Sequence, residues 1–462
     1  MDLSKFPRLV AEHKLATILA VGIIARIVLM PISAHPFDMY IWYNISENIL
    51  KNGPFVLQTF PPLWSHYMMI PVAYTYGWLS GVFSSGAIPM SSLPSTLNFY
   101  PASNIQYVPG MLFNFIVKIP FLISDIAIAF LLYKIVGELT GNKRHAEKAA
   151  ILWFLNPFAI WISAGWGMWD TLPALFSLAA FFFLLKKKIG LSAVCLSLGV
   201  ALKLYPALFL APIAIYLLKT SPAEIKLKNS LRFCALFIVT TLLLFLPYIG
   251  MVTNFFNGYF MPNPSSSTLA DPVVYPLGFG LTYWSLFLLN RLLHLSITAG
   301  FVSFASIASI LFVVSTVVFT YWKTYKFSIR KPSFDLALFM LLPVIALFLS
   351  FRFICEQWFV WAIPFLIILY AGGRIKGAIY WGASAVSLIY ALLNLPLPFF
   401  FLPLAPLYQN TLLSLLNVYW AFEPFRILSL AVLGCIFSLL MVLIVVNLRK
   451  VRISERLESI DN

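Results

Sequence analysis

Long apolar stretches occupy most of this chain and limit it to few kinds of fold. Hydrophobic residues make up 61% of the 462 residues and charged residues only 10%. Many apolar stretches reach the roughly 20 residues that a helix needs to cross a bilayer. The sequence therefore predicts an all-α polytopic membrane protein with about 12 transmembrane helices, in a range of about 11–13. The predicted spans are centred near residues 24, 128, 155, 178, 196, 211, 240, 310, 343, 364, 385 and 436.

The lysines and arginines gather in every second loop between these stretches. Because cytoplasmic loops carry an excess of basic residues, we expect these loops and both termini to face the cytoplasm, with residues 449–462 as a cytoplasmic tail. The loops account for the net charge of +15, so membrane lipids are the expected counter-surface and nucleic acid is not an expected partner. The basic segments lie around residues 5–14, 134–148, 186–188, 219–232, 323–331, 374–376 and 449–456.

Residues 34–107 form a long first loop that this alternation places on the outer face. Within it, residues 39–52 place isoleucines at helical spacing, which predicts an amphipathic helix in the outer interface. The stretch 61–83 is long enough to span, but a span here would invert every later basic loop. We interpret it as interfacial or partly re-entrant, and 84–107 as a flexible connector. The chain, 1–462, is otherwise expected to be a single membrane-embedded domain.

Several kinds of site are not indicated. The four cysteines have no spacing typical of metal ligands, so neither a zinc site nor a disulfide framework is predicted. The sequence contains neither a P-loop nor a complete dinucleotide-binding fingerprint. We therefore expect no metal and no cofactor.

Two acids near the predicted outer face are candidates for chemistry. Asp38 directly follows the first span, and Asp170 lies at a short turn between the third and fourth. Either carboxylate can be explained as the N-cap of the helix that follows it. Either can also serve a site, since an acid at the mouth of a span has to face a cavity, a partner or water. Asp125, about two turns inside the second span, suits a buried structural partner and a functional acid equally.

Two cations stand at tight outer turns, and each needs an anion. Arg352 has Glu356 four residues further on, so an internal ion pair is one explanation for it. Lys203 precedes a Tyr205-Pro206 break and has no acid nearby in sequence, which favours a ligand phosphate as its partner.

Together these residues resemble the GT-C superfamily of polytopic glycosyltransferases, which use polyprenyl-phosphate sugars. The resemblance extends over about residues 14–372, and its motifs occur in the expected order. One departure is Cys355, which stands where a histidine is expected. The motifs are His35-Pro36-Phe37-Asp38, Phe60-Pro61-Pro62-Leu63-Trp64, Asn156-Pro157, Trp166-Gly167-Met168-Trp169-Asp170, Lys203-Leu204-Tyr205-Pro206 and Arg352-Phe353-Ile354-Cys355-Glu356-Gln357.

The resemblance implies transfer of a hexose, mannose or glucose, from a polyprenyl- or dolichyl-phosphate donor to a lipid-linked or glycolipid acceptor, with inversion. It is closest to glucosyltransferases that extend lipid-linked oligosaccharides and to the mannosyltransferase of glycolipid anchors. The short loops and the lack of a long cytoplasmic tail favour a prokaryotic, archaeal-type cell membrane as the location, and the endoplasmic reticulum is expected if the source is a eukaryote. The implied roles are general base for Asp38, donor-phosphate binding for Lys203 and Arg352, and substrate binding for Asp170, Tyr205 and Glu356.

Two other functions fit parts of this pattern. A secondary transporter or lipid flippase commonly has twelve spans with both ends inside, but it usually shows two repeated halves and broken helices near the midplane. Here the sparse outer charges lie at the rim, and the long loop belongs to one half alone, which favours an enzyme. A scaffold subunit of a glycosylation complex is the other alternative, and in that case Asp38 would be dispensable for transfer.

Overall fold

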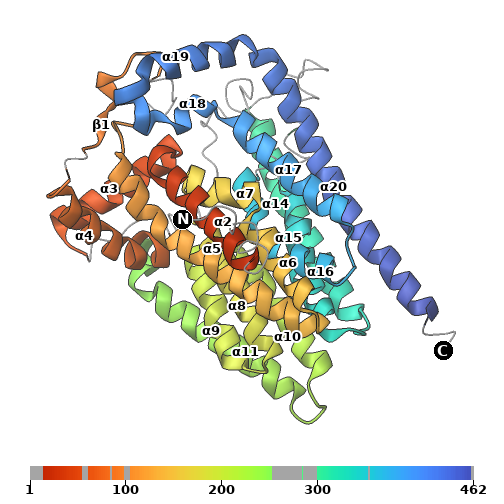
Figure 1. Cartoon of the computed structure of the whole chain (residues 1–462). Helices are drawn as coiled ribbons and strands as arrows, with labels where there is room; N and C mark the ends of the chain where they lie inside the picture. Colours follow the sequence, from red (N-terminus) through yellow and green to blue (C-terminus); the bar gives the residue numbers. More distant parts are fainter. Residues whose placement is uncertain are drawn as a thin grey trace, which may run out of the picture.

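The computed structural model describes residues 14–54, 61–83, 86–97, 105–251, 284, 299–351 and 354–458. These residues are mostly helical, as predicted, and the strands among them are a single antiparallel pair of two residues each, β1 (Ile88–Pro89) and β2 (Tyr107–Val108). Figure 1 shows the helices as a bundle, with a smaller group of helices on one side and one helix across the top. The all-α membrane class is therefore confirmed.

The first part of the chain forms one long helix and then a group of shorter ones. Pro31 lies within the last turn of the first helix, and Pro36 starts the next, so the chain turns between them. The elements are α2 (Lys14–Ile32), α3 (Pro36–Asn52), the π-helix η2 (Leu63–Met68), α4 (Met69–Ser80) and the 3₁₀ turn η3 (Met90–Ser92).

The helix predicted over 39–52 is present as α3, and its buried face includes Met39, Trp42, Ile45 and Ile49. Trp42 packs edge-on against Trp64 and Trp169, at centroid distances of 5.6 and 4.6 Å. The apolar face of α3 is therefore covered by protein. In the predicted connector 84–107, Ile88, Pro89 and Tyr107 belong to the strand pair, while residues 84–85 and 98–104 lie outside the described residues.

The middle of the chain supplies the tightest part of the bundle, where α5, α6, α8, α9 and α11 pack side by side (Figure 1). Its elements are α5 (Met111–Thr140), α6 (Lys143–Phe154), α7 (Pro157–Ile160), the π-helix η4 (Trp161–Trp166), α8 (Thr171–Leu185), α9 (Ile189–Leu202), η5 (Tyr205–Phe209), α10 (Leu210–Thr220), α11 (Lys226–Phe245) and η6 (Leu246–Met251).

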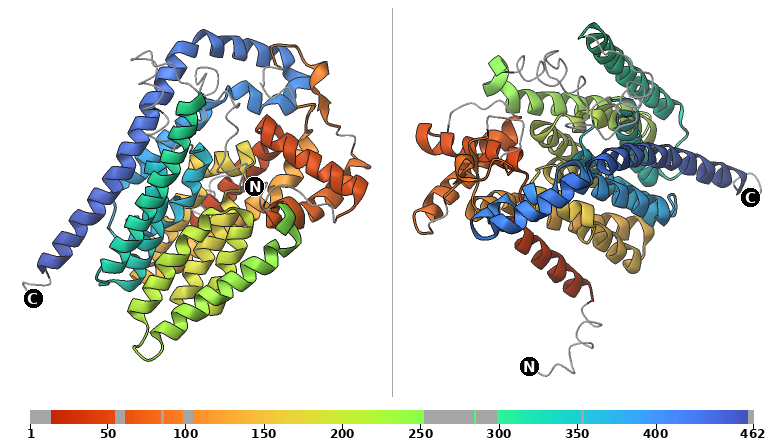
Figure 2. Two further views of the ribbon diagram at one scale, coloured as in Figure 1. Left: turned by 180° about the vertical axis from the view of Figure 1, so that it is seen from behind. Right: turned by 90° about the horizontal axis from the view of Figure 1, so that it is seen from above.

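The last part completes the bundle and covers one end of it. Helix α20 runs along the bundle, and α19 crosses its end (Figure 2). A second hydrophobic cluster joins α18 and α19 to the β1–β2 region through Met90, Val108, Phe399 and Leu412. The elements are α14 (Ala299–Lys326), α15 (Pro332–Ser350), η7 (Glu356–Trp361), α16 (Ile363–Ala371), α17 (Gly377–Asn394), α18 (Leu397–Phe400), η8 (Leu402–Leu404), α19 (Ala405–Ala421) and α20 (Glu423–Glu458).

Six of the helices in the described residues are long and apolar enough to cross a membrane, and a bent pair, Lys143–Phe154 with Pro157–Trp166, would make seven. The six are Leu15–Ile32, Met111–Thr140, Lys226–Gly250, Pro332–Ser350, Gly377–Asn394 and Phe425–Lys450. Four shorter apolar helices, Thr171–Leu185, Ile189–Leu202, Tyr205–Thr220 and Glu356–Ala371, coincide with predicted spans. The number of twelve remains a prediction.

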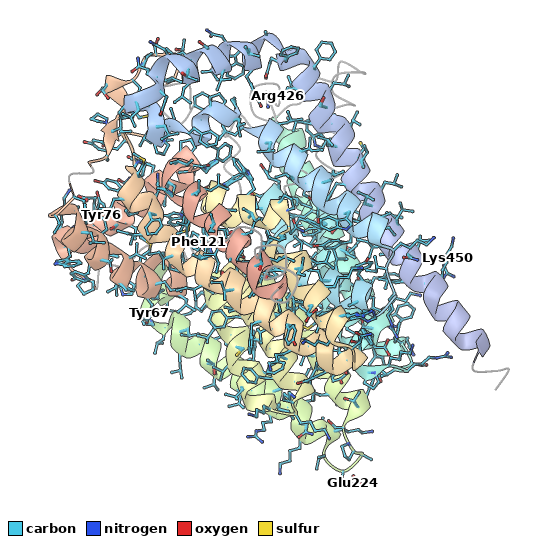
Figure 3. All side chains as sticks on the ribbon, in the orientation of Figure 1. Tyr67, Tyr76, Phe121, Glu224, Arg426 and Lys450 are labelled. Carbon is cyan, nitrogen blue, oxygen red and sulfur yellow. The ribbon has the colours of Figure 1, made fainter. Side chains whose placement is uncertain are left out.

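Several of the predicted basic loops that the structure describes meet at one end of the bundle. Lys186 at the end of α8 pairs with Glu138 near the end of α5 at 2.5 Å. Lys148 on α6 donates to the hydroxyl of Tyr370 at 2.7 Å. Lys219 donates to the carbonyl of Phe327 at 2.6 Å, which joins the α10 and α14 ends. Figure 3 shows Glu224 at this end and Arg426 far from it. Which end faces the cytoplasm remains a prediction.

Candidate functional site

The candidate residues lie at the end opposite the basic turns. Asp170 precedes α8 and Lys186 follows it, so the two are separated by a helix of 15 residues, about 22 Å long. Lys203 likewise lies at the far end of α9 from Lys188. Among the described residues, Asp170 and Lys203 therefore lie at the same end, away from the basic turns.

Asp38 lies in the first turn of α3, but it is not the N-cap. His35 is the N-cap, so that interpretation of Asp38 is wrong. The Asp38 carboxylate instead faces across to η4. The indole Nε1 of Trp166 donates to Asp38 Oδ2 at 2.7 Å, and His35 Nδ1 lies 2.9 Å from the same oxygen. The Asp38 side chain keeps 15% of its surface exposed, so the carboxylate is held from one side and accessible from another.

His35 contacts Asp38 through one nitrogen in two ways. The Asp38 backbone N–H lies 3.3 Å from Nδ1 and can donate to it when the imidazole is neutral. When Nδ1 carries a proton, it can donate to Asp38 Oδ2 instead. The protonation state of His35 therefore determines whether it serves the helix end or the carboxylate.

The electrostatic surroundings favour the ionised form of Asp38. Burial raises the pKa of this carboxyl, but the charge and hydrogen bond of His35, the Trp166 indole and the more distant charge of Lys203 together hold the pKa below its usual range. Asp38 is therefore a carboxylate at neutral pH, as a general base has to be.

An aromatic clamp, formed by His35, Trp166 and Phe400, fixes this contact. The His35 and Trp166 rings stack at 4.5 Å, and Phe400 of α18 packs edge-on against both. Main-chain bonds join the same three segments, because His35 N donates to Trp166 O and Ala34 N to Phe400 O, at 2.9 and 2.7 Å. Both His35 and Trp166 lie in motifs visible in the sequence, but their roles could not be assigned from it.

Gly167 allows Trp166 to approach α3. Its φ of 88° is left-handed, and an added Cβ would come within 2.5 Å of Met39 Cε and 2.6 Å of Lys118 Cε. A larger residue would be strained at this φ and would displace the ends of the Met39 and Lys118 side chains.

Asp170, predicted to bind substrate, and Lys203, predicted to bind the donor phosphate, contact each other. Lys203 Nζ donates to Asp170 Oδ1 at 2.7 Å, and the Trp361 indole donates to the same oxygen at 2.6 Å. Asp170 occupies the N-cap position of α8 but makes no capping bond with its side chain, so the N-cap explanation is also wrong. Its Oδ2 is buried without a partner in the described structure. Lys203 thus has a protein carboxylate beside it, which the sequence separation concealed.

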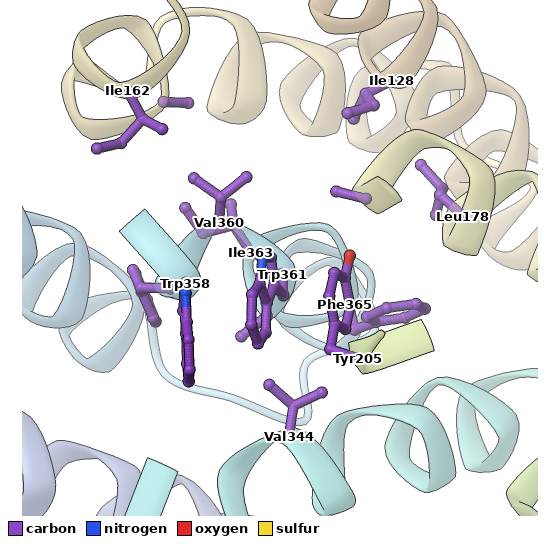
Figure 4. Packing of buried hydrophobic residues seen from close by; sticks show 14 of the residues in the cluster. Ile128, Ile162, Leu178, Tyr205, Val344, Trp358, Val360, Trp361, Ile363 and Phe365 are labelled. Carbon is purple, nitrogen blue, oxygen red and sulfur yellow. The ribbon is translucent and has the colours of Figure 1, made fainter. Parts of the chain in front are cut away.

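Aromatic rings surround the Lys203 ammonium. Trp169, Trp361 and Trp358 have their centroids 5.0, 5.3 and 6.0 Å from Nζ. Figure 4 shows Tyr205 beside Trp361, on which it stacks at 3.9 Å. The Tyr205 hydroxyl, like Asp170 Oδ2, is buried and makes no hydrogen bond of normal geometry among the described residues.

Glu356 is buried, and its Oε1 accepts from Asn394 Nδ2 at 2.9 Å. It lies near enough to His35 and Asp38 to interact with their charges. Arg352 lies outside the described residues, so neither its pairing with Glu356 nor its phosphate contact is described.

Asp125 proves to be a structural partner. Its Oδ2 lies 2.7 Å from Arg26 Nε and accepts from Ser163 at 2.7 Å, with both charged side chains fully buried. Arg26 also donates to the carbonyls of Gly22 and Phe154. This pair lies inside the bundle and has no access to solvent.

No group of three or more His, Cys, Asp or Glu side chains among the described residues could hold a metal ion. The arrangement brings the Asp38 carboxylate and the Lys203 ammonium to the same end of the bundle.

A family model described as GPI transamidase subunit PIG-U matches residues 92–270. Similar curated proteins are named GPI mannosyltransferase 1. The one from Dictyostelium discoideum is 32% identical over 126 residues, which cover 27% of this chain and 28% of that protein. The one from Candida albicans is 27% identical over 132 residues, 27% of this chain and 32% of that protein. The one from Saccharomyces cerevisiae is 27% identical over 124 residues, 26% of this chain and 30% of that protein.

The predicted resemblance to the glycolipid-anchor mannosyltransferase is confirmed. The alignments cover about a third or less of each relative's length. The range matched by the PIG-U model contains Asp170, Lys203 and Tyr205, but not Asp38 or Glu356.

Proposed function

We propose that this chain is an inverting hexosyltransferase that moves a sugar from a polyprenyl- or dolichyl-phosphate donor to a glycolipid acceptor. The observation that carries the proposal is the Asp38 carboxylate, ionised, held through one oxygen and partly exposed at the end of a membrane bundle. The names of the relatives favour mannose as the sugar and a GPI-type glycolipid as the acceptor.

In the proposed reaction an acceptor hydroxyl attacks the anomeric carbon of the donor sugar while Asp38 takes its proton. The bond between that carbon and the phosphate oxygen breaks, and its electron pair leaves with the polyprenyl phosphate. One displacement inverts the configuration. The donor is already activated by its phosphate, so no nucleotide takes part.

Lys203 is proposed to stabilise the phosphate as its negative charge increases. Asp170 holds the ammonium in place at 2.7 Å, and the three tryptophans keep water from it. Asp170 Oδ2 and the Tyr205 hydroxyl are proposed to bind sugar hydroxyls. Arg352 and Glu356 keep the roles predicted for them, phosphate and substrate binding.

The PIG-U match supports a second candidate, a non-catalytic subunit of a complex that acts on glycolipid anchors. That candidate gives no role to a base, and Asp38 lies outside the matched range. A transporter or flippase is distinguished by chemistry, since in detergent no vectorial transport is possible.

The test is transfer of radiolabelled sugar by purified protein in detergent. Dolichyl-phosphate mannose and dolichyl-phosphate glucose would be offered separately, with a glucosaminyl-phosphatidylinositol acceptor and, in parallel, a lipid extract of the host. We expect label in a new lipid product with the mannose donor. No product with either donor and either acceptor would contradict the proposal and favour a subunit or transport role.

A further inference from the structure

Lys118 is a fully buried cation that the predicted chemistry does not use. It lies two turns into α5, with no exposed surface. No acid in the described structure forms an ion pair with it, unlike Arg26 one helix away, which has Asp125. A lysine at such a position is costly and calls for a physical explanation.

The partners of the Lys118 ammonium are main-chain carbonyls from two different helix ends. Nζ donates to the carbonyl of Met30 at 3.1 Å and to that of Ser33, at the end of α2. The carbonyls of Ala164, at 2.8 Å, and Gly165, at 3.3 Å, also lie within hydrogen-bonding distance at the end of η4, so that four carbonyls share the three protons of the ammonium. Cations are favoured at helix C-termini because the last carbonyls lack partners within the helix.

These carbonyls lack helical partners for a specific reason. The amide of Ala34, which would bond Met30 O in a continuing helix, donates to Phe400 O instead. The amides of Gly167 and Met168 both turn back to Ile162 O. The Ala34 amide is thus used in the aromatic clamp, the Gly167 and Met168 amides close the end of η4, and Lys118 supplies a donor to the carbonyls left over.

The residues that directly follow these two helix ends contact Asp38. Two residues after Ser33 is His35, the N-cap that contacts Asp38, and the residue after Gly165 is Trp166, whose indole donates to Asp38. Ser33 Oγ adds a direct bond to Gly165 O at 2.9 Å. We infer that Lys118 is a positioning residue for Asp38, because its ammonium fixes the start of α3 and the end of η4 at the separation that the Asp38–Trp166 contact requires.

The chemistry of this junction is specific to a lysine. An apolar residue of the same length would leave several buried carbonyls without donors. A guanidinium is larger than an ammonium, and Lys118 Cε already lies against Gly167. The inference rests on the proposed function for its kinetic consequence, but its structural consequence can be measured without turnover.

The test compares Lys118→Met with Arg26→Met. Both remove a buried cation that donates to main-chain carbonyls, but Arg26 contacts Gly22, Phe154 and the Asp125 carboxylate inside the bundle, and none of these residues bonds Asp38. Hydrogen exchange on both variants would report the amides of residues 33–38 and 166–168, relative to the other amides of the bundle, because loss of either cation lowers overall stability. We expect Lys118→Met to lose protection at these two segments beyond that reference and Arg26→Met to show no such extra loss. Equal protection of these segments, relative to that reference, in Lys118→Met and the unaltered protein would overturn the inference, whatever the enzyme does.

Kinetics give the second readout. We expect kcat of Lys118→Met to fall by about 10²-fold with little change in KM for the donor, since displacement of a reacting group by about 1 Å has that effect. Arg26→Met should keep its kcat per folded molecule. If Lys118→Met does not fold, Ser33→Ala weakens the same junction and should give a smaller fall in kcat, and an unchanged kcat would then overturn the inference. An inactive unaltered protein would contradict the proposed function, while exchange would still decide the role of Lys118.

Discussion

Two side chains of the π-helix η4, Ser163 and Trp166, each donate a hydrogen bond to a carboxylate, and the two carboxylates lie in very different surroundings. Ser163 donates to Asp125, which pairs with a permanently charged arginine, and both side chains are fully buried. Trp166 donates to Asp38, which pairs with a titratable histidine and stays 15% exposed. The same element thus builds a closed structural pair and a half-open acid. Solvent access therefore distinguishes Asp38, the candidate base, from Asp125, the structural acid.

The largest expected effect is the loss of stability when the closed pair, Arg26 with Asp125, is broken. Asp125→Asn leaves Arg26 buried without a counter-charge, which should lower the free energy of unfolding by about 3–5 kcal/mol. Thermal unfolding in detergent would measure it. Asp38→Asn is the matched control and should change stability by less than about 1 kcal/mol. Equal losses in the two variants would mean that both carboxylates are structural.

The Lys203–Asp170 pair is buried like the Arg26–Asp125 pair, and it is also proposed to bind substrate. A double variant separates its structural role from its proposed catalytic role. Lys203→Met or Asp170→Asn alone should cost about 3 kcal/mol of stability, because each leaves a buried charge unpaired. The double variant should regain most of this stability but no transfer activity, since the ammonium proposed to meet the donor phosphate is gone. Recovery of both would show that the pair has no role beyond folding.

The hydrogen bond to Asp38 should matter to catalysis more than to folding. Trp166→Phe keeps an aromatic ring for stacking on His35 but removes the indole donor. A hydrogen bond to a charged group is worth about 1.5–3 kcal/mol, so kcat should fall by roughly 10- to 100-fold. Trp161→Phe, on the same π-helix but not bonded to Asp38, is the control. A similar fall in both would assign the effect to packing of η4.

The smallest effect concerns pH. The pKa of Asp38 is held below its usual range. Its carboxylate, the base form, is therefore present at every pH above this lowered pKa and is lost only as the pH falls through it. In His35→Asn the main lowering influence is absent while burial still raises the pKa. The acid limb of kcat/KM should therefore move to higher pH. A limb that stays in place would mean that His35 does not interact with the charged form of Asp38.

The sequence predicts the helices and the end of the bundle at which the candidate residues lie, because apolar length and basic loops are one-dimensional signals. It could not predict that Lys203 pairs with Asp170, 33 residues away, since that contact depends on how α8 and α9 end side by side. It assigned no role to Lys118, although a lysine inside an apolar stretch is itself a signal. The main-chain carbonyls that accept from the Lys118 ammonium are free to do so only where two helices end. The spacing of residues in the sequence does not show where that happens.

The central claim is that Asp38 removes the acceptor proton. The most direct measurement is sugar transfer from dolichyl-phosphate mannose by purified Asp38→Asn, beside the unaltered protein, with thermal unfolding of both. Loss of a general base typically costs about 10²–10⁴-fold in rate. We predict a fall of that size in a variant that unfolds at nearly the same temperature. Transfer at close to the unaltered rate would contradict the account.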